Sequence, residues 1–497
     1  MPPTTSPSEY PDSTPLSGSD GGSSDSADSS PQLEDSGAKP AHVRWSPLEI
    51  ALMVGAVLLI TINAFEAMAT TTIMPNVVAD LGAESWFSVA SGAALAAQLT
   101  ATVIAGGLSD SRGPRIVLIG GTAVFLAGVL ICATAPHIAV FVAGRLIQGV
   151  GGGLVIVPLY VLTGLVGDQS HRPAFFAAFS MAWVLPSIVG PALAGWITTQ
   201  VGWRWVFGGI PLVALLACIP LLRVLYQIPE IERQPARKLG YLTLFAGGAG
   251  AAIFLLQLSG ALEGIISWAL IGAGFILLGI TLPRLLPAGT LTFRQGLPSL
   301  VATRAWMTGA FTGATAILPL LLQRVHEWTT ESAAIAVTIG SVGWSFGSLI
   351  QSRFNSEQLR VRLPLIGTIL VAVGLIPLSL LLIKSAPLWP VLLGLIIAAC
   401  GIGLAHSSLS VRILDVLPRN EHGKGSSWLQ VADSAGGAVE LAATSILLGL
   451  WAQVATDSIG FTYIPAPILA ILFALGAVFA AFRGLAISSS TRAEQSP

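Results

Sequence analysis

A charged, glycine-rich turn separates two apolar runs in the first half of the chain: GGLSDSRGPR, residues 106–115. One acid, two arginines, a proline and three glycines are gathered there. The whole chain of 497 residues is 53% hydrophobic and only 10% charged, whereas soluble domains carry about 25% charged residues. The composition therefore predicts an integral membrane protein, in which this turn is a loop at the membrane surface.

Fourteen apolar segments are long enough to cross a bilayer as helices, because a span needs about 20 apolar residues and lipid-exposed backbone must satisfy its own hydrogen bonds. The segments are 48–72, 85–108, 115–135, 138–166, 173–199, 204–225, 240–261, 264–285, 299–323, 331–352, 362–383, 387–411, 425–452 and 463–485. The turn at 106–115 joins the second span to the third. We therefore predict an all-α integral membrane fold with fourteen transmembrane helices.

The basic residues predict the orientation of these spans. Arg145 falls inside a span, while Arg204, Arg324 and Lys384 fall in loops on one side. Every other Lys and Arg lies in a tail, in a loop on the opposite side or at a span end beside it. Cytoplasmic loops carry an excess of Lys and Arg, and an even number of spans places both chain ends on one side. The pattern predicts a multi-pass protein of the cell membrane with both termini in the cytoplasm.

An internal repeat divides the spans into two halves. GGLSDSR at 106–112 matches GSLIQSR at 347–353 in Gly, Leu, Ser and Arg, and each segment follows the second span of a group of six. The two spans between the groups, joined by a very short turn at Glu263, are then an inserted hairpin. Two six-helix halves around a site at the membrane midplane are typical of secondary transporters.

The predicted organisation has five parts. They are a disordered cytoplasmic tail at 1–45, a six-helix bundle at 46–226, a linker with the inserted hairpin at 227–288, a second six-helix bundle at 289–486 and a cytoplasmic tail at 487–497. The first tail is rich in Ser, Pro, Asp and Gly, so we expect that it cannot bury enough apolar surface to fold.

The turn at 106–115 resembles the loop motif of the major facilitator superfamily, G-x-L-x-D-x-x-G-x-[RK]. The matching residues are Gly106, Leu108, Asp110, Gly113 and Arg115. The resemblance implies the major-facilitator fold and a conformational latch in this loop that stabilises the outward-facing state. The latch residues are Gly106, Asp110, Gly113 and Arg115. Glycines allow a tight turn, and Asp110 can face the positive start of a helix or pair with a basic side chain.

Four further segments extend the resemblance across the first six spans. RLIQGVGGG at 145–153 is similar to the family's fourth-span pattern, and PSIVGPALAG at 186–195 looks like its antiporter motif. WRWVF at 203–207 opens the sixth span, as in the fourteen-helix drug:proton antiporters, and EAMATTTIMP at 66–75 resembles the first-span motif of that group, with Glu66 at the acid position. The antiporter-motif matches are Gly190, Pro191 and Gly195. By this resemblance they shape a proton-tight fifth span.

Ionisable side chains inside the spans are the candidates for proton coupling and for the substrate cavity. They are Glu66, Arg145, Asp433, Glu440 and His406. A charge near the bilayer centre costs roughly 2.5–3.5 kcal/mol on insertion scales, so it needs a partner or a function. Asp433 and Glu440 are seven positions apart, which places them on one helix face about 10 Å from each other. We expect this face to line the cavity.

Glu66 and Arg145 are expected at similar depths in the membrane. Glu66 lies nine positions before Pro75, near the outer end of the first span, and Arg145 lies eight positions after His137, near the outer start of the fourth. At 1.5 Å per residue these depths are roughly 13 and 12 Å, so the two side chains could meet. We predict that Glu66 exchanges protons, with Asp433 or Glu440 as the alternative proton site.

The sequence favours a proton-coupled secondary transporter that exports amphipathic or hydrophobic compounds by alternating access. Its partners would be a small amphipathic or lipid-like substrate, protons and the bilayer, and we expect a monomer. The alternatives are a transporter of a cell-envelope lipid or metabolite, a transport-dead sensor, and a membrane-embedded acyltransferase, for which His406 followed by Ser407 and Ser408 is the only hint.

Several other classes of protein are disfavoured by motifs that the sequence lacks. It has no G-x-x-x-x-G-K-[ST] loop, so an ion gradient is the expected energy source rather than ATP. It has no Cys pair or His motif of the metal-binding kind, so we expect no metal and no cofactor. A formal net charge of −1 does not suggest a nucleic-acid partner.

Overall fold

The computed structural model describes residues 45–166, 171–227, 240–353, 357–417, 422–452 and 459–485. Within these ranges every regular element is helical, and 14 candidate spans are long and apolar enough to cross a membrane. The predicted all-α fold and its number of spans are confirmed. Nearly all of the two predicted tails, and residues 228–239 of the predicted linker, lie outside the described residues, so the domain boundaries placed there stay predictions.

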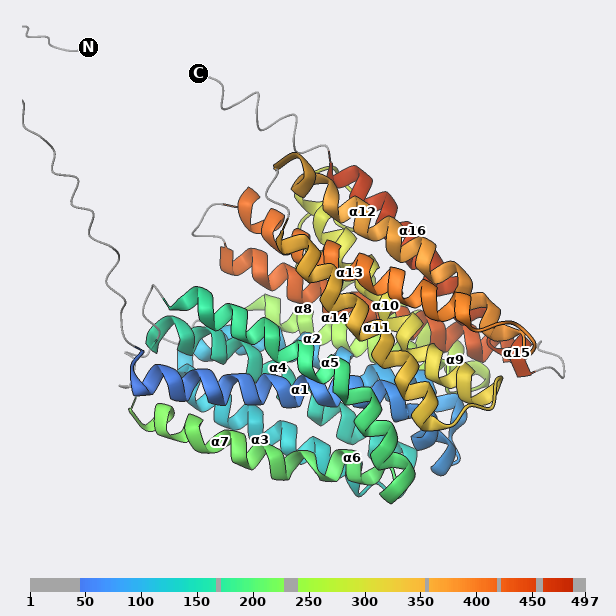
Figure 1. The fold of residues 1–497 in the computed structure, drawn as a ribbon, viewed down its shortest axis with the longest axis horizontal. Coiled ribbons are helices and arrows are strands. Elements are labelled where there is room, and N and C mark those ends of the chain that lie inside the picture. The colour runs from blue at the N-terminus through green and yellow to red at the C-terminus, as the bar shows by residue number, and fades with distance from the viewer. Residues whose placement is uncertain are drawn as a thin grey trace, which may run out of the picture. The chain divides into compact units, whose positions relative to one another are not determined.

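The first half is built from two groups of helices. The elements are α1 (Pro47–Asp80), η1 (Glu84–Trp86), α2 (Phe87–Arg112), α3 (Pro114–Ala133), α4 (Ile138–Val166), α5 (Arg172–Val201), α6 (Arg204–Gly208) and α7 (Ile210–Gln227). α1 packs against α5 and α7, and α4 packs against α2 and α3 (Figure 1). The contact between α3 and α4 is close because Gly128 lies against the backbone of Gln148, where a Cβ would collide. Small residues let membrane helices approach in this way.

The second half repeats this arrangement. Its elements are α10 (Leu297–Arg324), α11 (Thr330–Ser352), α12 (Glu357–Leu375), η2 (Ile376–Leu382), α13 (Trp389–Val416), α14 (His422–Ala452), α15 (Ile459–Thr462) and α16 (Pro465–Gly484). α13 packs against α11 and α12, and α10 packs against α14 and α16. Gly367 and Gly401 face each other where α12 crosses α13.

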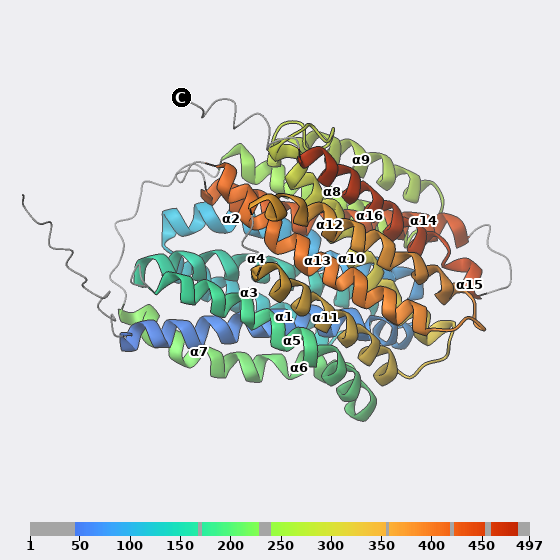
Figure 2. The ribbon, with the colours of Figure 1, turned by 45° about the horizontal axis from the view of Figure 1, so that its top comes forward.

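The predicted hairpin is present between the halves, as α8 (Tyr241–Ser259) and α9 (Gly264–Leu285). Glu263 precedes α9, and Gly264 makes the short turn possible because its φ is +71°, which side chains rarely adopt. α8 packs against α9, against α2 of the first half and against α14 of the second (Figure 2). The hairpin is therefore in contact with both halves.

Helix α1 begins where the sequence predicts but ends later. Ser46 and Glu49 form a capping box, in which the Ser46 N–H donates to Glu49 Oε2 at 2.8 Å and the Glu49 N–H donates to Ser46 Oγ at 3.1 Å. The predicted span ended at residue 72, but the helix continues through Pro75 to Asp80. Proline is tolerated in membrane helices because neighbouring groups satisfy the freed backbone. Glu66 therefore lies near the middle of α1, because the helix extends beyond the predicted end of the span.

Polar contacts join the two halves at one end of the bundle. We call the end where the described chain begins, at Trp45, the near end, and the opposite end, where α1 ends and α2 begins, the far end (Figure 1). Among the described residues, three polar side-chain contacts cross between the halves at the far end: Arg324 Nη2 to Glu84 Oε1 at 2.6 Å, Asn76 Nδ2 to Thr330 Oγ1 at 2.9 Å, and Thr199 Oγ1 to Glu331 Oε1 at 2.5 Å.

A surface ion pair also lies at the far end, within the second half. Lys384 Nζ is 2.6 Å from Glu327 Oε1. The hydrogen bond from Lys384, and then the attraction of its charge, hold the pKa of the exposed Glu327 carboxyl below its usual value. Such exposed pairs add little to stability, so this one does not explain how the halves are held.

Candidate functional site

The structure brings Glu66 and Arg145 together in the interior of the first half. Arg145 Nη1 lies 2.5 Å from Glu66 Oε1, and the two side chains are 5% and 9% exposed, respectively. Glu66 comes from the middle of α1, and Arg145 comes from the second turn of α4. The expectation that the two side chains could meet is confirmed.

Neighbouring polar groups complete this cluster. Thr70 Oγ1, one helical turn after Glu66, donates to Glu66 Oε1 at 2.6 Å. Arg145 Nη1 also donates to Gln148 Oε1 at 2.7 Å, and Arg145 Nε donates to the carbonyl of Ala90 on α2 at 3.4 Å. A buried charge pair needs such additional hydrogen bonds, because both ions have lost their water. The cluster therefore ties α1, α2 and α4 together.

A second charged cluster lies in the second half, centred on Asp433 of α14. Arg304 of α10 holds both carboxylate oxygens, with Nε to Oδ1 at 2.6 Å and Nη2 to Oδ2 at 2.8 Å, and Thr308 Oγ1 donates to Oδ1 at 2.7 Å. Sequence reasoning missed Arg304, because it counted this residue as a charge at a span end. α10 begins at Leu297, so Arg304 is seven residues inside the helix, and its depth was the signal that could have identified it.

His406 of α13 belongs to the same cluster. Its Nε2 is 3.6 Å from Asp433 Oδ2, and its ring lies 5.3 Å from that of Trp344, centroid to centroid. Arg304 Nη1 donates to the carbonyl of His406 at 2.7 Å and to Ser410 Oγ at 3.0 Å. Arg304 therefore connects three helices of the second half: α10, α13 and α14.

Glu440, also on α14, lies outside the Asp433 cluster and is closely packed. It faces Gly313 of α10, where a Cβ would collide with the Glu440 carboxyl group. Glu440 is fully buried; its Oε1 accepts a hydrogen bond from Thr444 Oγ1 at 2.9 Å, and its Oε2 has no hydrogen-bond partner among the described residues. Asp433 and Glu440 share one face of α14, as their spacing predicted, and this face lies against α10, where only Asp433 contacts a basic side chain. That the face lines a cavity stays a prediction.

The predicted latch lies at the turn between α2 and α3. Gly106 and Asp110 belong to the last turns of α2, Gly113 ends that helix with a φ of +85°, and Pro114 starts α3. The guanidinium of Arg115 lies over the ring of Tyr226, 4.8 Å from its centroid. The side chain of Asp110 lies outside the described part of the structure, so the predicted latch contact stays a prediction.

The antiporter-motif residues lie on α5, where it meets both halves. Gly190 faces Phe65 and Met68 of α1 at ordinary contact distance. Gly195 packs against Ala334 of α11 so closely that a Cβ would collide with it. Pro191 lies inside the helix between them. α5 therefore contacts α1 at Gly190 and the second half at Gly195. A proton-sealing role for these residues stays a prediction.

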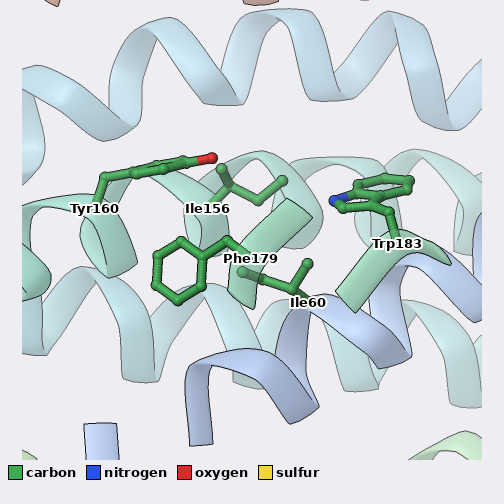
Figure 3. Close-up of a pocket in the computed structure, with 5 residues that line it drawn as sticks. All are labelled: Ile60, Ile156, Tyr160, Phe179 and Trp183. Atoms are coloured by element: carbon green, nitrogen blue, oxygen red, sulfur yellow. The ribbon is translucent and has the colours of Figure 1, made fainter. Parts of the chain in front are cut away.

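An open pocket lies between α1, α4 and α5, and sequence reasoning missed it. Its volume is about 90 Å³, and the lining residues are Ile60, Ile156, Tyr160, Phe179 and Trp183 (Figure 3). The aromatic positions on α5 are spaced by four, as at Phe175, Phe179 and Trp183. That spacing puts them on one helix face and was the available signal.

Two six-helix halves, an inserted hairpin and charged clusters inside the spans are typical of membrane transporters. The family model of the Major Facilitator Superfamily matches residues 56–439. The chain therefore belongs to the Major Facilitator Superfamily, whose members are transporters.

Multidrug transporters are among the proteins similar to this chain. Multidrug resistance protein 3 of Bacillus subtilis (strain 168) is 26% identical over 385 residues, covering 76% of this chain and 75% of its own. A multidrug resistance protein B homolog of Mycobacterium tuberculosis (strain ATCC 25618 / H37Rv) is 24% identical over 363 residues, covering 70% and 67%. The predicted resemblance to drug transporters of the superfamily is confirmed by these relatives.

Solved structures of transporters share the fold. The peptide transporter POT in complex with sulfate superposes with a TM-score of 0.66 at 14% identity, covering 90% of this chain and 99% of its own. A D-xylose–proton symporter superposes with a TM-score of 0.60 at 17% identity, covering 88% and 96%. At these identities the likeness shows the fold alone.

Proposed function

We propose that the protein is a proton-coupled exporter of amphipathic or hydrophobic compounds that works by alternating access. The observation that carries the proposal is the buried contact of Glu66 with Arg145, surrounded by Thr70 and Gln148. An ion pair inside a membrane helix bundle is a functional-site hypothesis by default. The multidrug relatives support the class of substrate and the direction of transport.

Glu66 is the proposed proton carrier. When ionised, its carboxylate is stabilised by the Arg145 guanidinium and the Thr70 hydroxyl. When Glu66 Oε1 takes up a proton, the attraction to Arg145 is lost, and Arg145 keeps Gln148 Oε1 and the Ala90 carbonyl as acceptors. Protonation of Glu66 therefore weakens one contact between α1 and α4, while the Arg145 guanidinium keeps hydrogen-bond acceptors. In this way proton binding is coupled to the packing of the two helices.

Glu440 is the proposed second proton site. A carboxylate whose Oε2 is buried without a partner is costly when ionised and much less so when protonated. Asp433 is a weaker candidate, because the Arg304 fork and Thr308 already hold its ionised form. We assign to this Asp433 cluster the role of keeping α10, α13 and α14 together during transport.

We assign the near end to the cytoplasm, because the basic residues concentrate in the loops and tails on that side. The far-end contacts between the halves then close the extracellular side, and the latch at Gly106, Asp110, Gly113 and Arg115 acts in the opposite, outward-facing state. A reporter in the loop at 286–298 should be accessible from the cytoplasm; labelling of that loop from outside would contradict this orientation.

Reconstituted protein tests the function. Proteoliposomes with an imposed pH gradient should drive labelled amphipathic compounds against their own gradient, and collapse of the pH gradient should stop this movement. Flux that follows only the compound's own gradient would contradict proton coupling. Formation of an acylated product without any gradient would support the acyltransferase alternative instead.

A further inference from the structure

The pocket between α1, α4 and α5 is separate from both charged clusters. The hydrogen bonds described above for Glu66, Arg145 and Asp433 involve none of the residues that line the pocket. Ile60 lies six positions before Glu66 on α1, which is about 9 Å along the helix axis. The pocket therefore lies on the near-end side of the Glu66–Arg145 pair, along the same helix.

The floor of the pocket is fixed and its walls are accessible. Phe179 is 2% exposed and is held edge-on by two rings, Tyr160 at 5.5 Å and Phe175 at 6.3 Å between centroids. Ile60 is 3% exposed. Tyr160 and Trp183 are 45% and 39% exposed, respectively. A molecule can therefore reach the aromatic walls without disturbing the packed floor.

The chemistry of the walls defines what fits between them. Figure 3 shows the Tyr160 hydroxyl and the Trp183 indole nitrogen pointing toward each other across the pocket, with Ile156 between them. The Trp183 indole N–H can donate a hydrogen bond, and both rings offer surface for edge-to-face or offset contact with another ring. None of the lining residues carries an ionisable charge at neutral pH. A volume of about 90 Å³ has room for part of a molecule, and cavities of this order bind single aromatic rings.

We propose that this pocket binds a neutral aromatic ring that carries a hydrogen-bond acceptor, as one part of the transported compound. The proposal rests on the proposed function and names its class of substrate. A compound seated here by its ring can extend about 9 Å along α1 toward Glu66. The pocket then supplies recognition, and the Glu66–Arg145 pair supplies coupling to protons.

Fluorine NMR with para-fluoroacetophenone tests the pocket, because this probe is a neutral single ring with a carbonyl acceptor. The protein is used in lipid nanodiscs, and empty nanodiscs measure uptake of the probe by lipid. Wild-type protein should bind the probe above that background, and Trp183→Ala should weaken binding by about tenfold. Trp183→Phe should retain most of the ring contact but lose the contribution of the indole N–H.

Trp196→Ala is the matched control, because Trp196 lies on the same helix and is 55% exposed but does not line the pocket. Its binding of the probe should equal that of wild type, and the melting temperature of each variant checks folding. Equal binding by Trp183→Ala and Trp196→Ala, or no wild-type binding above empty nanodiscs, would overturn the proposal. Binding of the probe without gradient-driven transport would instead contradict the exporter function but support the pocket as a binding site.

Discussion

The three acids inside the spans differ in their hydrogen-bond and ion-pair partners. Asp433 receives both arms of the Arg304 fork and a threonine hydroxyl, whereas Glu66 meets Arg145 through one oxygen. A bidentate pair is stronger and more specific than a single contact. Glu440 has no basic partner among the described residues. These differences suggest that Asp433 is a structural anchor and that the two glutamates exchange protons.

Replacement of Glu66 tests the proton carrier. Glu66→Gln should abolish gradient-driven transport but leave some substrate binding or downhill flux, because the amide cannot exchange a proton. Glu66→Asp should keep part of the activity. The deciding measurement is substrate-induced proton release or uptake by the purified protein between about pH 5 and pH 9. Wild-type proton exchange in Glu66→Gln would show that Glu66 is not the coupling residue and would favour Glu440.

Replacement of Arg304 tests the anchor. Arg304→Met leaves the Asp433 carboxylate without its cation, and loss of one partner of a buried pair costs about 3–5 kcal/mol. We therefore expect a clear fall in the melting temperature of Arg304→Met. The double variant Arg304→Met/Asp433→Leu should recover much of that stability, because no unpaired charge remains. A double variant as unstable as the single one would mean that the ion pair is not what destabilises Arg304→Met.

At the scale of elements, α8 connects the halves through one buried side chain. Gln257 is fully buried, and its Nε2 donates to the carbonyl of Ala438 on α14 at 3.3 Å. Ser445 Oγ donates back to the carbonyl of Gln257 at 2.7 Å. On the other side, Gly92 of α2 leaves the space that the Gln257 amide fills. The inserted hairpin is therefore hydrogen-bonded to α14 and packed against α2.

A paired substitution tests this fit. Gly92→Ala places a Cβ against the Gln257 amide, and such overpacking costs about 1–3 kcal/mol. Shortening the partner should relieve the collision, so Gly92→Ala/Gln257→Ala should be more stable than Gly92→Ala alone. Thermal unfolding of the four proteins, with Gln257→Ala as the matched single variant, measures this. Strictly additive losses would show that the two positions do not interact.

At the scale of the whole molecule, the two halves meet through polar contacts at the far end that water could replace. Glu84 with Arg324 and Asn76 with Thr330 are side-chain contacts, and the side chains of Arg324 and Glu84 are 32% and 57% exposed, respectively. Contacts of this kind stabilise one arrangement by small free energies. They are therefore suited to a structure that has to open there during each cycle.

A reversible cross-link tests that opening. In a background without the three native cysteines, cysteines at positions 76 and 330 should cross-link, because the native side chains are in hydrogen-bond contact. The cross-linked protein should not transport, and a reductant should restore the activity. Each single-cysteine variant serves as the control. Full transport by the cross-linked protein would mean that this contact stays closed throughout the cycle.

The sequence by itself was sufficient for the number of spans, the hairpin and the two halves. These features follow from the length of apolar runs and from the repeat at 106–112 and 347–353, which are local properties of the chain. It also identified Glu66, Arg145, Asp433 and Glu440, because an ionisable group in an apolar run is conspicuous without any structure.

Only the tertiary structure decided which of these groups meet. Arg304 became visible as the partner of Asp433 through the packing of α10 on α14. Glu440 became visible as an acid with no basic partner among the described residues, since it faces Gly313 and accepts a hydrogen bond from Thr444. The aromatic pocket depends on three helices from separate parts of the chain. Helix rotation and crossing angle set such contacts, and they depend on side-chain packing along the whole interface, which no local pattern of residues specifies.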